Sequence, residues 1–391
     1  MKIHDCDVLI IGGGLVGAAL ACALRDTALS VMVLEGRAPE IEWDAASWDS
    51  RIYAISPASR RFLTGIGAWQ QLDAARTQRV GQMLITGDDR RARLDFDATA
   101  AGADELARIV ESRELQRALW QTAATAPNVQ LLAGVKPTGM QFDQADATIT
   151  LDDGRCLSSR LVVGADGVQS WVRQQVGIDA QVRPYQQWGV VANFECAKPH
   201  LGMARQWFFD DGILAWLPLP GNRISMVWSC NDATRAELLA LDAAALCERV
   251  ATAGDNALGA LQLLTPAAAF PLRLVHVSEL VRPNLALVGD AAHGVHPLAG
   301  QGVNLGFGDV EQLARVLKAE PSARCGDLMV LRRYARARRE SIYLMQGVTH
   351  ALQHLFNNQN SLLKPLRNFG LGLTDQLTWL KQQLIRHAMD S

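Results

Sequence analysis

Residues 287–306 combine one carboxylate with several glycines in a pattern that could hold a flat, polar ligand. Asp290 is the only charged residue of this stretch, and a carboxylate in an apolar segment is costly unless it is paired or hydrogen-bonded. Gly300 and Gly302 carry no side chain where a helix is expected to begin, and the free N–H groups of a helix start attract an anion or an electron-rich ring edge. The stretch predicts a cofactor site; the alternative is a core strand followed by a tight turn.

The N-terminus has the spacing of a dinucleotide-binding turn. Its six residues are Gly12, Gly13, Gly14, Leu15, Val16 and Gly17, which match G-x-G-x-x-G. Gly12 would make the tight turn, Gly14 would let the backbone approach a pyrophosphate, and Gly17 would let helix and strand pack closely. Glu35 lies eighteen positions after Gly17, where the fingerprint places an acid that accepts a hydrogen bond from a ribose hydroxyl. A bound dinucleotide is predicted, and NAD and FAD both remain open.

Two further residues are candidates for ligand contacts. Asp166 follows the apolar run 161–163 within Gly-Ala-Asp-Gly, ahead of a helix that has Ser170 and Arg173 on its first turn. Ligands of open α/β sheets bind at the carboxyl ends of strands, which is the position of Asp166. Arg51 could pair with a phosphate, or it could be an ordinary surface arginine.

The elements expected to position these residues alternate between strand and helix. Residues 7–11, 30–34 and 161–163 are short apolar runs typical of buried parallel strands. Residues 18–24 and 111–125 have the composition of helices, and a further helix is expected to start near Ser56-Pro57. This alternation predicts an α/β fold.

Residues 180–275 differ, because β-type runs and four tryptophans replace the alternation. Residues 80–97 are expected to form two strands around a turn, and 234–260 to be helical. Three antiparallel strands are predicted at 206–209, 213–217 and 223–228. The resulting sheet could simply form a hydrophobic core, or it could line an apolar substrate pocket. Both can hold, because one face of the sheet can pack in the core while the other lines the pocket.

The basic run at 332–339 predicts a solvated helix face, with a phosphate or membrane-surface contact as the alternative. The last fifty residues are expected to form one or two amphipathic helices with more bases than acids. The net charge of −2 gives no general attraction to nucleic acid. Seven scattered cysteines, with no C-x-x-C pair, argue against a disulfide framework and a zinc or other metal site, and suit a reducing cytosol. No secretory signal or membrane-spanning run is expected.

Taken together, the G-x-G-x-x-G turn, Gly-Ala-Asp-Gly-x-x-Ser-x-x-Arg at 164–173 and Gly-Asp-Ala-Ala-His at 289–293 resemble the class A FAD-dependent aromatic hydroxylases. The match spans almost the whole chain. The segment 296–306 together with Asp309 resembles the signature of the ubiquinone-biosynthesis monooxygenases, which hydroxylate polyprenylated phenols. The segments 49–55 and 109–120 are also similar to that subfamily.

The resemblance implies a Rossmann-like FAD-binding domain, an inserted and mainly antiparallel β-sheet substrate domain, and a helical C-terminus. The FAD-binding domain would be discontinuous, with residues 1–79, 100–180 and 276–340. The substrate domain would comprise residues 80–99 and 181–275, and the C-terminal helical segment residues 341–391.

The resemblance also implies which residues surround FAD. Gly12, Gly14 and Gly17 would lie under the pyrophosphate, and the 300–304 backbone would face the pyrimidine edge of the isoalloxazine. The complete set is Gly12, Gly14, Leu15, Val16, Gly17, Glu35, Gly36, Arg37, Arg51, Asp166, Gly289, Asp290, Pro297, Gly300, Gln301, Gly302, Val303 and Asn304. Pro297 and His296 are the catalytic candidates: Pro297 would shape the oxygen site, and His296 lies beside the flavin or is a structural loop residue. Ser112 departs from the family, where relatives often carry Arg, Asn or Gln that reaches the cofactor.

The implied reaction is hydroxylation of a polyprenyl phenol by a flavin C4a-hydroperoxide, with O₂ and NAD(P)H as co-substrates. No second G-x-G-x-x-G is present to bind the nicotinamide. Three alternatives remain: the same chemistry on a small soluble aromatic, reduction of isoprenoid double bonds, and an FAD-binding subunit with a role in assembly only. A cytoplasmic enzyme is expected, and contacts with the inner membrane or a quinone-biosynthesis protein complex are hypotheses.

Overall fold

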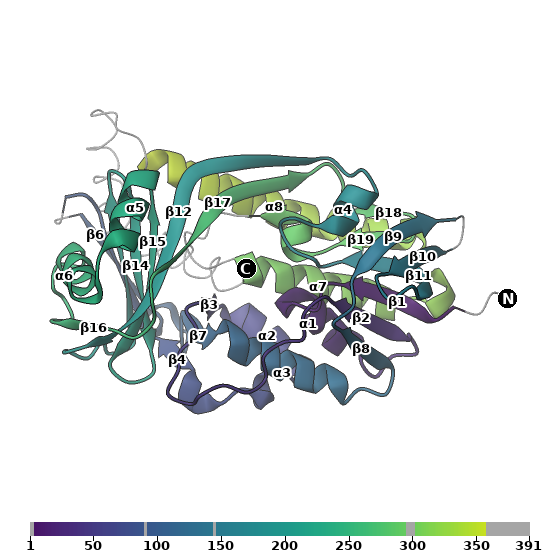
Figure 1. Cartoon of the computed structure of the whole chain (residues 1–391), viewed down its shortest axis with the longest axis horizontal. Coiled ribbons are helices and arrows are strands. Elements are labelled where there is room, and N and C mark those ends of the chain that lie inside the picture. Colours follow the sequence, from purple (N-terminus) through teal and green to yellow (C-terminus); the bar gives the residue numbers. More distant parts are fainter. Residues whose placement is uncertain (1–3, 90–91, 144–145, 295–301, 357–391) are drawn as a thin grey trace.

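The computed structural model describes residues 4–89, 92–143, 146–294 and 302–356. An eight-stranded sheet forms one half of the molecule, at the right of Figure 1. Strands β1, β2, β8, β11 and β19 run parallel, and β9, β10 and β18 pair antiparallel at its margins. The strands are β18 (Val281–Arg282), β19 (Leu285–Leu287), β11 (Cys156–Gly164), β1 (Cys6–Ile11), β2 (Val31–Glu35) and β8 (Val129–Ala133), with β10 (Ala147–Leu151) beside β11 and β9 (Pro137–Phe142) beside β10.

Helices cover one face of this sheet because they carry apolar stripes that match its apolar strands. The covering helices are α1 (Leu15–Leu24), α3 (Ser112–Ala124), α7 (Gly302–Lys318) and α8 (Leu328–Phe356). The other face of the parallel strands packs against α4 (Trp171–Gln175), the ends of the long strands described below, and the antiparallel margin β9 and β10. The predicted parallel strands and the helices α1 and α3 are confirmed, although α3 begins at Ser112 because Glu111 ends the preceding strand.

A nine-stranded, mainly antiparallel sheet forms the other half. Helices α5 (Asp232–Ala240) and α6 (Ala243–Ala253) cover its outer face. Its two longest strands, β12 and β17, extend across to the first sheet (Figure 1). The strands are β20 (His293–Gly294), β17 (Ala268–Val277), β12 (Ala180–Cys196), β15 (Arg223–Cys230), β14 (Gly212–Leu219), β13 (Met203–Phe209), β5 (Gln82–Thr86) and β6 (Arg93–Asp97), with β16 (Leu261–Leu263) beside β12.

A small antiparallel sheet lies between the halves, and α2 (Pro57–Gly65) follows its first strand. The Ser56 side chain caps α2 by accepting a hydrogen bond from the Ser59 N–H at 3.2 Å, as the Ser-Pro pair predicted. The strands are β3 (Ile52–Ile55), β7 (Ala107–Glu111) and β4 (Gln78–Val80). The 3-10 turns are Trp69–Gln71, Ala74–Arg76, Thr99–Ala101, Gly289–Ala291 and Ser322–Arg324.

Two expectations require correction. The helix predicted over 234–260 is wrong for residues 254–260, because Asp255 and Asn256 adopt positive φ angles of 58° and 52° that end α6. The solvated face predicted for the basic run is wrong for Arg338, which lies against α7 and pairs with Asp309. None of the helices in the described part of the chain has the length and apolar composition needed to span a bilayer.

Candidate functional site

The carboxyl ends of β1, β11 and β19 meet and bring the three motifs together. The Ala165 N–H donates to the Ile11 carbonyl at 2.8 Å, and the Val288 N–H donates to the Gly164 carbonyl at 3.0 Å. These bonds place Asp166 and Gly289 next to the glycine turn that follows β1. The candidate site therefore lies at the strand ends, where open α/β sheets bind their ligands.

Close approaches explain the glycines of this region. Gly12 has a φ of +103°, which favours glycine. A Cβ on Gly17 would lie 1.9 Å from the Gly12 carbonyl oxygen, so α1 packs on β1 as predicted. A Cβ on Gly306 would lie 2.7 Å from the Val16 side chain. Because glycine has no side chain at this position, the start of α7 can pack directly on α1. Around Gly14, by contrast, a Cβ would meet nothing within 4 Å, so this turn faces open space.

Gly13, which the fingerprint does not require to be glycine, is as constrained as Gly12 and Gly17. Its N–H donates to Glu35 Oε2 at 2.7 Å, and its carbonyl accepts from Trp120 Nε1 at 2.7 Å and Gln116 Nε2 at 2.5 Å. A Cβ at this position would lie 2.7 Å from the Trp120 ring. Sequence reasoning missed Trp120 and Gln116, and their helical spacing of four residues was the available signal.

Glu35 lies at the end of β2 with Gly36 and Arg37 beside it. Its Oε1 accepts the Arg37 N–H at 3.1 Å, and Gly36 and Arg37 are both exposed. A carboxylate oxygen accepts more than one hydrogen bond, so Glu35 retains acceptor capacity for a ribose hydroxyl.

Asp166 has an unused acceptor at the site. Its Oδ2 accepts the Val172 N–H at 2.9 Å, whereas its Oδ1 is buried and has no partner among the described residues. Burial raises the pKa of the Asp166 carboxyl above its ordinary value. Arg173 connects this motif to the next one by donating to the Ala291 carbonyl at 2.9 Å and the Val168 carbonyl at 2.8 Å.

Asp290 lies on the turn after β19. The residue is exposed to solvent, yet the surrounding protein desolvates its carboxyl group in part and so raises the pKa of that group. The charges of His293 and Arg51 oppose this shift. Arg51 precedes β3 and is 239 positions away in the chain. Only the fold brings the two predicted residues within electrostatic reach of each other.

A buried cluster supports the Asp290 turn from behind. Asp309 on α7 accepts hydrogen bonds from the Gly289 N–H at 2.9 Å, His293 Nε2 at 2.5 Å and Arg338 Nε at 2.7 Å. Burial alone raises the pKa of Asp309, but the charges of His293 and Arg338 and their hydrogen bonds outweigh it, so that this pKa lies below its ordinary value. The sequence pointed to Asp309 as part of the subfamily signature but did not predict this role.

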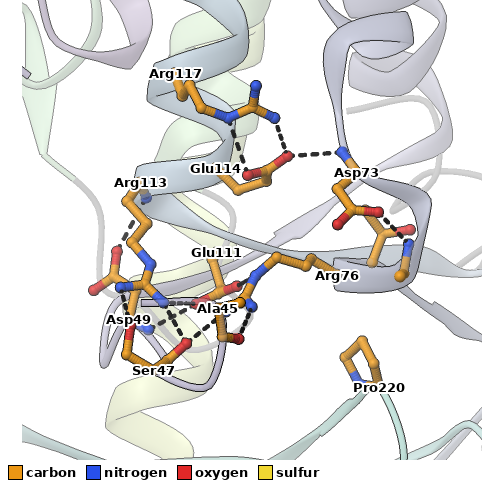
Figure 2. Close-up of polar contacts among 12 residues, drawn as sticks. Ala45, Ser47, Asp49, Asp73, Arg76, Glu111, Arg113, Glu114, Arg117 and Pro220 are labelled. Carbon is orange, nitrogen blue, oxygen red and sulfur yellow. Dashed lines mark hydrogen bonds and ion pairs between the residues drawn. The ribbon is translucent and has the colours of Figure 1, made fainter. Parts of the chain in front are cut away.

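Figure 2 shows how the segment before β3 is held on the start of α3. Glu111 is fully buried and accepts from the Asp49 N–H at 2.7 Å, Arg76 Nε at 2.6 Å and Arg113 at 3.2 Å. Asp49 accepts the backbone N–H groups of Arg113 at 3.0 Å and Arg51 at 2.9 Å. The backbone of Arg51 is therefore held by a buried ionic network.

The same segment also contacts the nine-stranded sheet. Asn193 on β12 donates to the Asp49 carbonyl at 2.8 Å. The guanidinium groups of Arg76 and Arg223 lie 4.5 Å and 5.4 Å from the Trp48 ring centroid, within cation–π range. The segment thus joins the small sheet that carries Arg51 to the proposed substrate sheet.

The start of α7 holds the last described candidates, Gly302, Val303 and Asn304. The Asn304 side chain donates to the Ala54 carbonyl at 2.9 Å and accepts the Ser56 N–H at 3.1 Å, so it clamps α7 to the β3–α2 junction. The other four candidates in this region lie outside the described residues: His296, Pro297, Gly300 and Gln301.

The features that a dinucleotide needs are present together: a glycine turn open at Gly14, an acid at the end of β2 and an unpartnered Asp166 oxygen. The residues fit FAD, whose pyrophosphate suits the N–H groups at the start of α1. Among the described residues, no cluster of three His, Cys, Asp or Glu side chains is placed to hold a metal ion.

Comparisons with known proteins indicate the same cofactor. The profile of the family described as FAD binding domain matches residues 5–345. Ubiquinone hydroxylase UbiL of Rhodospirillum rubrum is 37% identical over 98% of this chain and 89% of its own. The 3-demethoxyubiquinol 3-hydroxylase of Escherichia coli is 35% identical over the full length of both. The crystal structure of Pseudomonas aeruginosa PqsL in complex with 2-aminobenzoylacetate is 25% identical and superimposes with a TM-score of 0.81 over 94% of this chain and 100% of that chain.

Proposed function

The chain belongs to the FAD binding domain family of class A flavin hydroxylases, and we propose that it hydroxylates the aromatic ring of a polyprenylated phenol in ubiquinone biosynthesis. It is an FAD-dependent monooxygenase that uses O₂, with NAD(P)H as the co-substrate typical of the family. The observation that carries the substrate class is the sequence identity of 37% and 35%, over almost the whole chain, to the two hydroxylases named above. The resemblance of 296–306 to the signature of the ubiquinone subfamily supports it.

Within this function, the residues of the strand ends would bind and orient FAD. Gly14 would leave room for the pyrophosphate at the start of α1, where the N–H groups favour negative charge, and Gly12 and Gly17 would shape the turn beneath it. Glu35 and Asp166 would accept hydrogen bonds from hydroxyl groups of the cofactor. These roles are supported by the open turn at Gly14 and the unpartnered Asp166 oxygen.

Arg51, just before β3, and Asp290, on the turn after β19, would contact the phosphate and ribityl parts of FAD. Bound FAD supplies the activation of O₂, and the protein orients the ring and excludes water from it. The backbone at Gly302–Asn304, together with Gly300 and Gln301, would face the pyrimidine edge, where N–H groups stabilise developing negative charge. Pro297 and His296 remain the candidates nearest the reacting atoms.

The division of the chain is part of the proposal. Residues 1–79, 100–180 and 276–340 would bind FAD, and 80–99 and 181–275 would bind the substrate. Its support is that β5 pairs with β13 and β6 with β5 in the nine-stranded sheet, although 105 residues lie between β6 and β13 along the chain. We also propose peripheral contact with the inner membrane and with other quinone-biosynthesis proteins, because a polyprenyl substrate resides in the bilayer.

The test is extraction of quinones from cells that lack this gene, with mass spectrometry of the intermediates. We expect a prenylated phenol that lacks one hydroxyl group, and its missing position identifies the step. A complemented strain should restore the quinone. An unchanged quinone profile in cells without a redundant enzyme would contradict the proposal and favour a small soluble aromatic. Accumulation of a fully hydroxylated quinone whose tail has more double bonds than the wild-type quinone would favour the reductase.

A further inference from the structure

Helix α8 has two faces with opposite character, and the inward face is built into the cofactor region. Tyr334 is fully buried and its hydroxyl donates to the Leu287 carbonyl at 2.8 Å, at the end of β19. Arg338 pairs with Asp309 and donates to the Leu305 carbonyl at 3.0 Å. Leu331 and Ile342 complete this face in the core. The helix thus packs directly behind the elements that carry Asp290 and Asn304.

The outward face carries a stripe of five exposed side chains. They are spaced by three, four, three and four residues, which places them on one side of a helix. At the helical rise per residue the stripe is about 21 Å long. Its members are Met329, Arg332, Arg336, Arg339 and Tyr343, and we call it the α8 stripe.

The arginines of the α8 stripe have no acidic partner among the described residues. Neighbouring Arg333 pairs with Glu320 at 2.5 Å, whereas Arg332, Arg336 and Arg339 form no ion pair within the described parts of the chain. Glu340 is exposed beside them and is not paired with them either. Because the whole chain carries a net charge of −2, this positive surface is a local feature.

The ends of the stripe are apolar. Met329 is 60% exposed and Tyr343 is 54% exposed. The rings of Tyr343 and His276 on β17 lie 5.4 Å apart, which holds the tyrosine beside the long strands. A protein-binding surface usually has an apolar centre and a polar rim, which is the reverse of this order.

We propose that the α8 stripe docks on the surface of an anionic phospholipid bilayer. Arginine side chains bind phosphate groups in a forked geometry, and a tyrosine side chain suits the boundary between headgroups and acyl chains. The chain's own C-terminal residues do not complement the stripe, because Lys364, Arg367, Lys381 and Arg386 outnumber Asp375 and Asp390 there. Docking would place the back of the cofactor region one helix away from the membrane.

This inference rests on the proposed function for its biological use, because a polyprenyl phenol must be taken from a bilayer. The physical argument for docking does not depend on it. A basic residue next to an anionic leaflet increases partitioning roughly five-fold, so the three arginines together contribute about 100-fold. The interaction should weaken as salt screens the charges.

The experiment measures sedimentation of the full-length, FAD-loaded enzyme with vesicles of phosphatidylcholine, with and without phosphatidylglycerol. We expect the wild type to sediment with the anionic vesicles, and the variant R332Q/R336Q/R339Q to lose about 100-fold in partitioning. Equal binding of variant and wild type to anionic vesicles, or no preference of the wild type for them, would overturn the proposal. If R332Q/R336Q/R339Q still binds anionic vesicles as the wild type does but no longer binds an acidic protein that the wild type binds, the proposal would be overturned in favour of a protein partner.

A matched control separates the stripe from net charge. The variant R79Q/R155Q/R315Q removes the same charge from three exposed arginines outside α8 and should bind anionic vesicles as the wild type does. Thermal unfolding and FAD content establish that both variants fold. Hydroxylation of a phenol without a prenyl tail, in buffer, should be equal in all three proteins. If no phenol is hydroxylated by any of them, the proposed function fails while the vesicle result still decides the docking surface.

Discussion

The buried Asp309 cluster gives the sharpest prediction for stability. In Asp309→Asn the side chain keeps its shape but loses its charge, and the Arg338 guanidinium, only 12% exposed, loses its acidic partner. Removal of one partner from a buried ion pair costs about 3–5 kcal/mol, since it leaves an uncompensated charge. An asparagine oxygen still accepts hydrogen bonds, so we expect the lower end, about 3 kcal/mol. That is a large part of the stability of an ordinary domain.

Denaturant unfolding of the FAD-free protein measures this loss, and a second substitution tests its cause. Arg338→Met removes the charge that Asp309→Asn leaves unpaired, so the double variant should be more stable than additivity predicts by about 1–3 kcal/mol. Hydrogen exchange of the Gly289 amide should rise in Asp309→Asn because its acceptor is weakened. A loss below about 1 kcal/mol, or strict additivity with Arg338→Met, would refute the reasoning.

The pH dependence of this difference follows from the lowered pKa of Asp309. A carboxyl whose folded pKa lies below its unfolded value stabilises the fold above the unfolded pKa, and this stabilisation disappears as the pH falls through the folded pKa. The stability difference between wild type and Asp309→Asn should therefore be constant near neutrality and shrink below about pH 4. Denaturant titrations at a series of pH values check it; a difference that grows on acidification would contradict the sign.

Four other substitutions test the cofactor site. Gly13→Ala should cost about 1–3 kcal/mol in thermal unfolding, because its Cβ would lie 2.7 Å from the Trp120 ring, whereas Gly14→Ala should fold normally and lose only FAD affinity. Asn304→Ala leaves two backbone groups of the β3–α2 junction without partners and should lower unfolding free energy by about 2–3 kcal/mol. Asp290→Asn should weaken FAD binding in fluorescence titrations. Because the pKa of Asp290 is raised in the fold, its ionised form destabilises the FAD-free protein at any pH above the unfolded pKa of the carboxyl. In that pH range the FAD-free Asp290→Asn variant should therefore be slightly more stable than the FAD-free wild type.

Sequence patterns predicted the elements well where local chemistry decides them. The glycine turn after β1, the serine cap of α2 and the paired strands β5 and β6 follow from φ preferences, capping and alternation over a few residues. The end of α6 was missed, because the positive φ angles of Asp255 and Asn256 have only a weak local signal. Arg338 was wrongly predicted to be exposed to solvent, since nothing in the basic run distinguishes it from the neighbouring arginines that do not face α7.

By itself, the sequence predicted the chemistry of the site: a glycine turn after β1, and the acids Glu35, Asp166 and Asp290 at or just after the ends of β2, β11 and β19. Their order and spacing also indicated the family. Only the tertiary structure decided what holds those residues. Asp309 meets Arg338 through the packing of α7 on α8, and Arg51 comes near Asp290 across 239 residues. The reason is physical: backbone preferences act over a few residues, whereas the partner of a buried charge depends on how distant helices and sheets pack together.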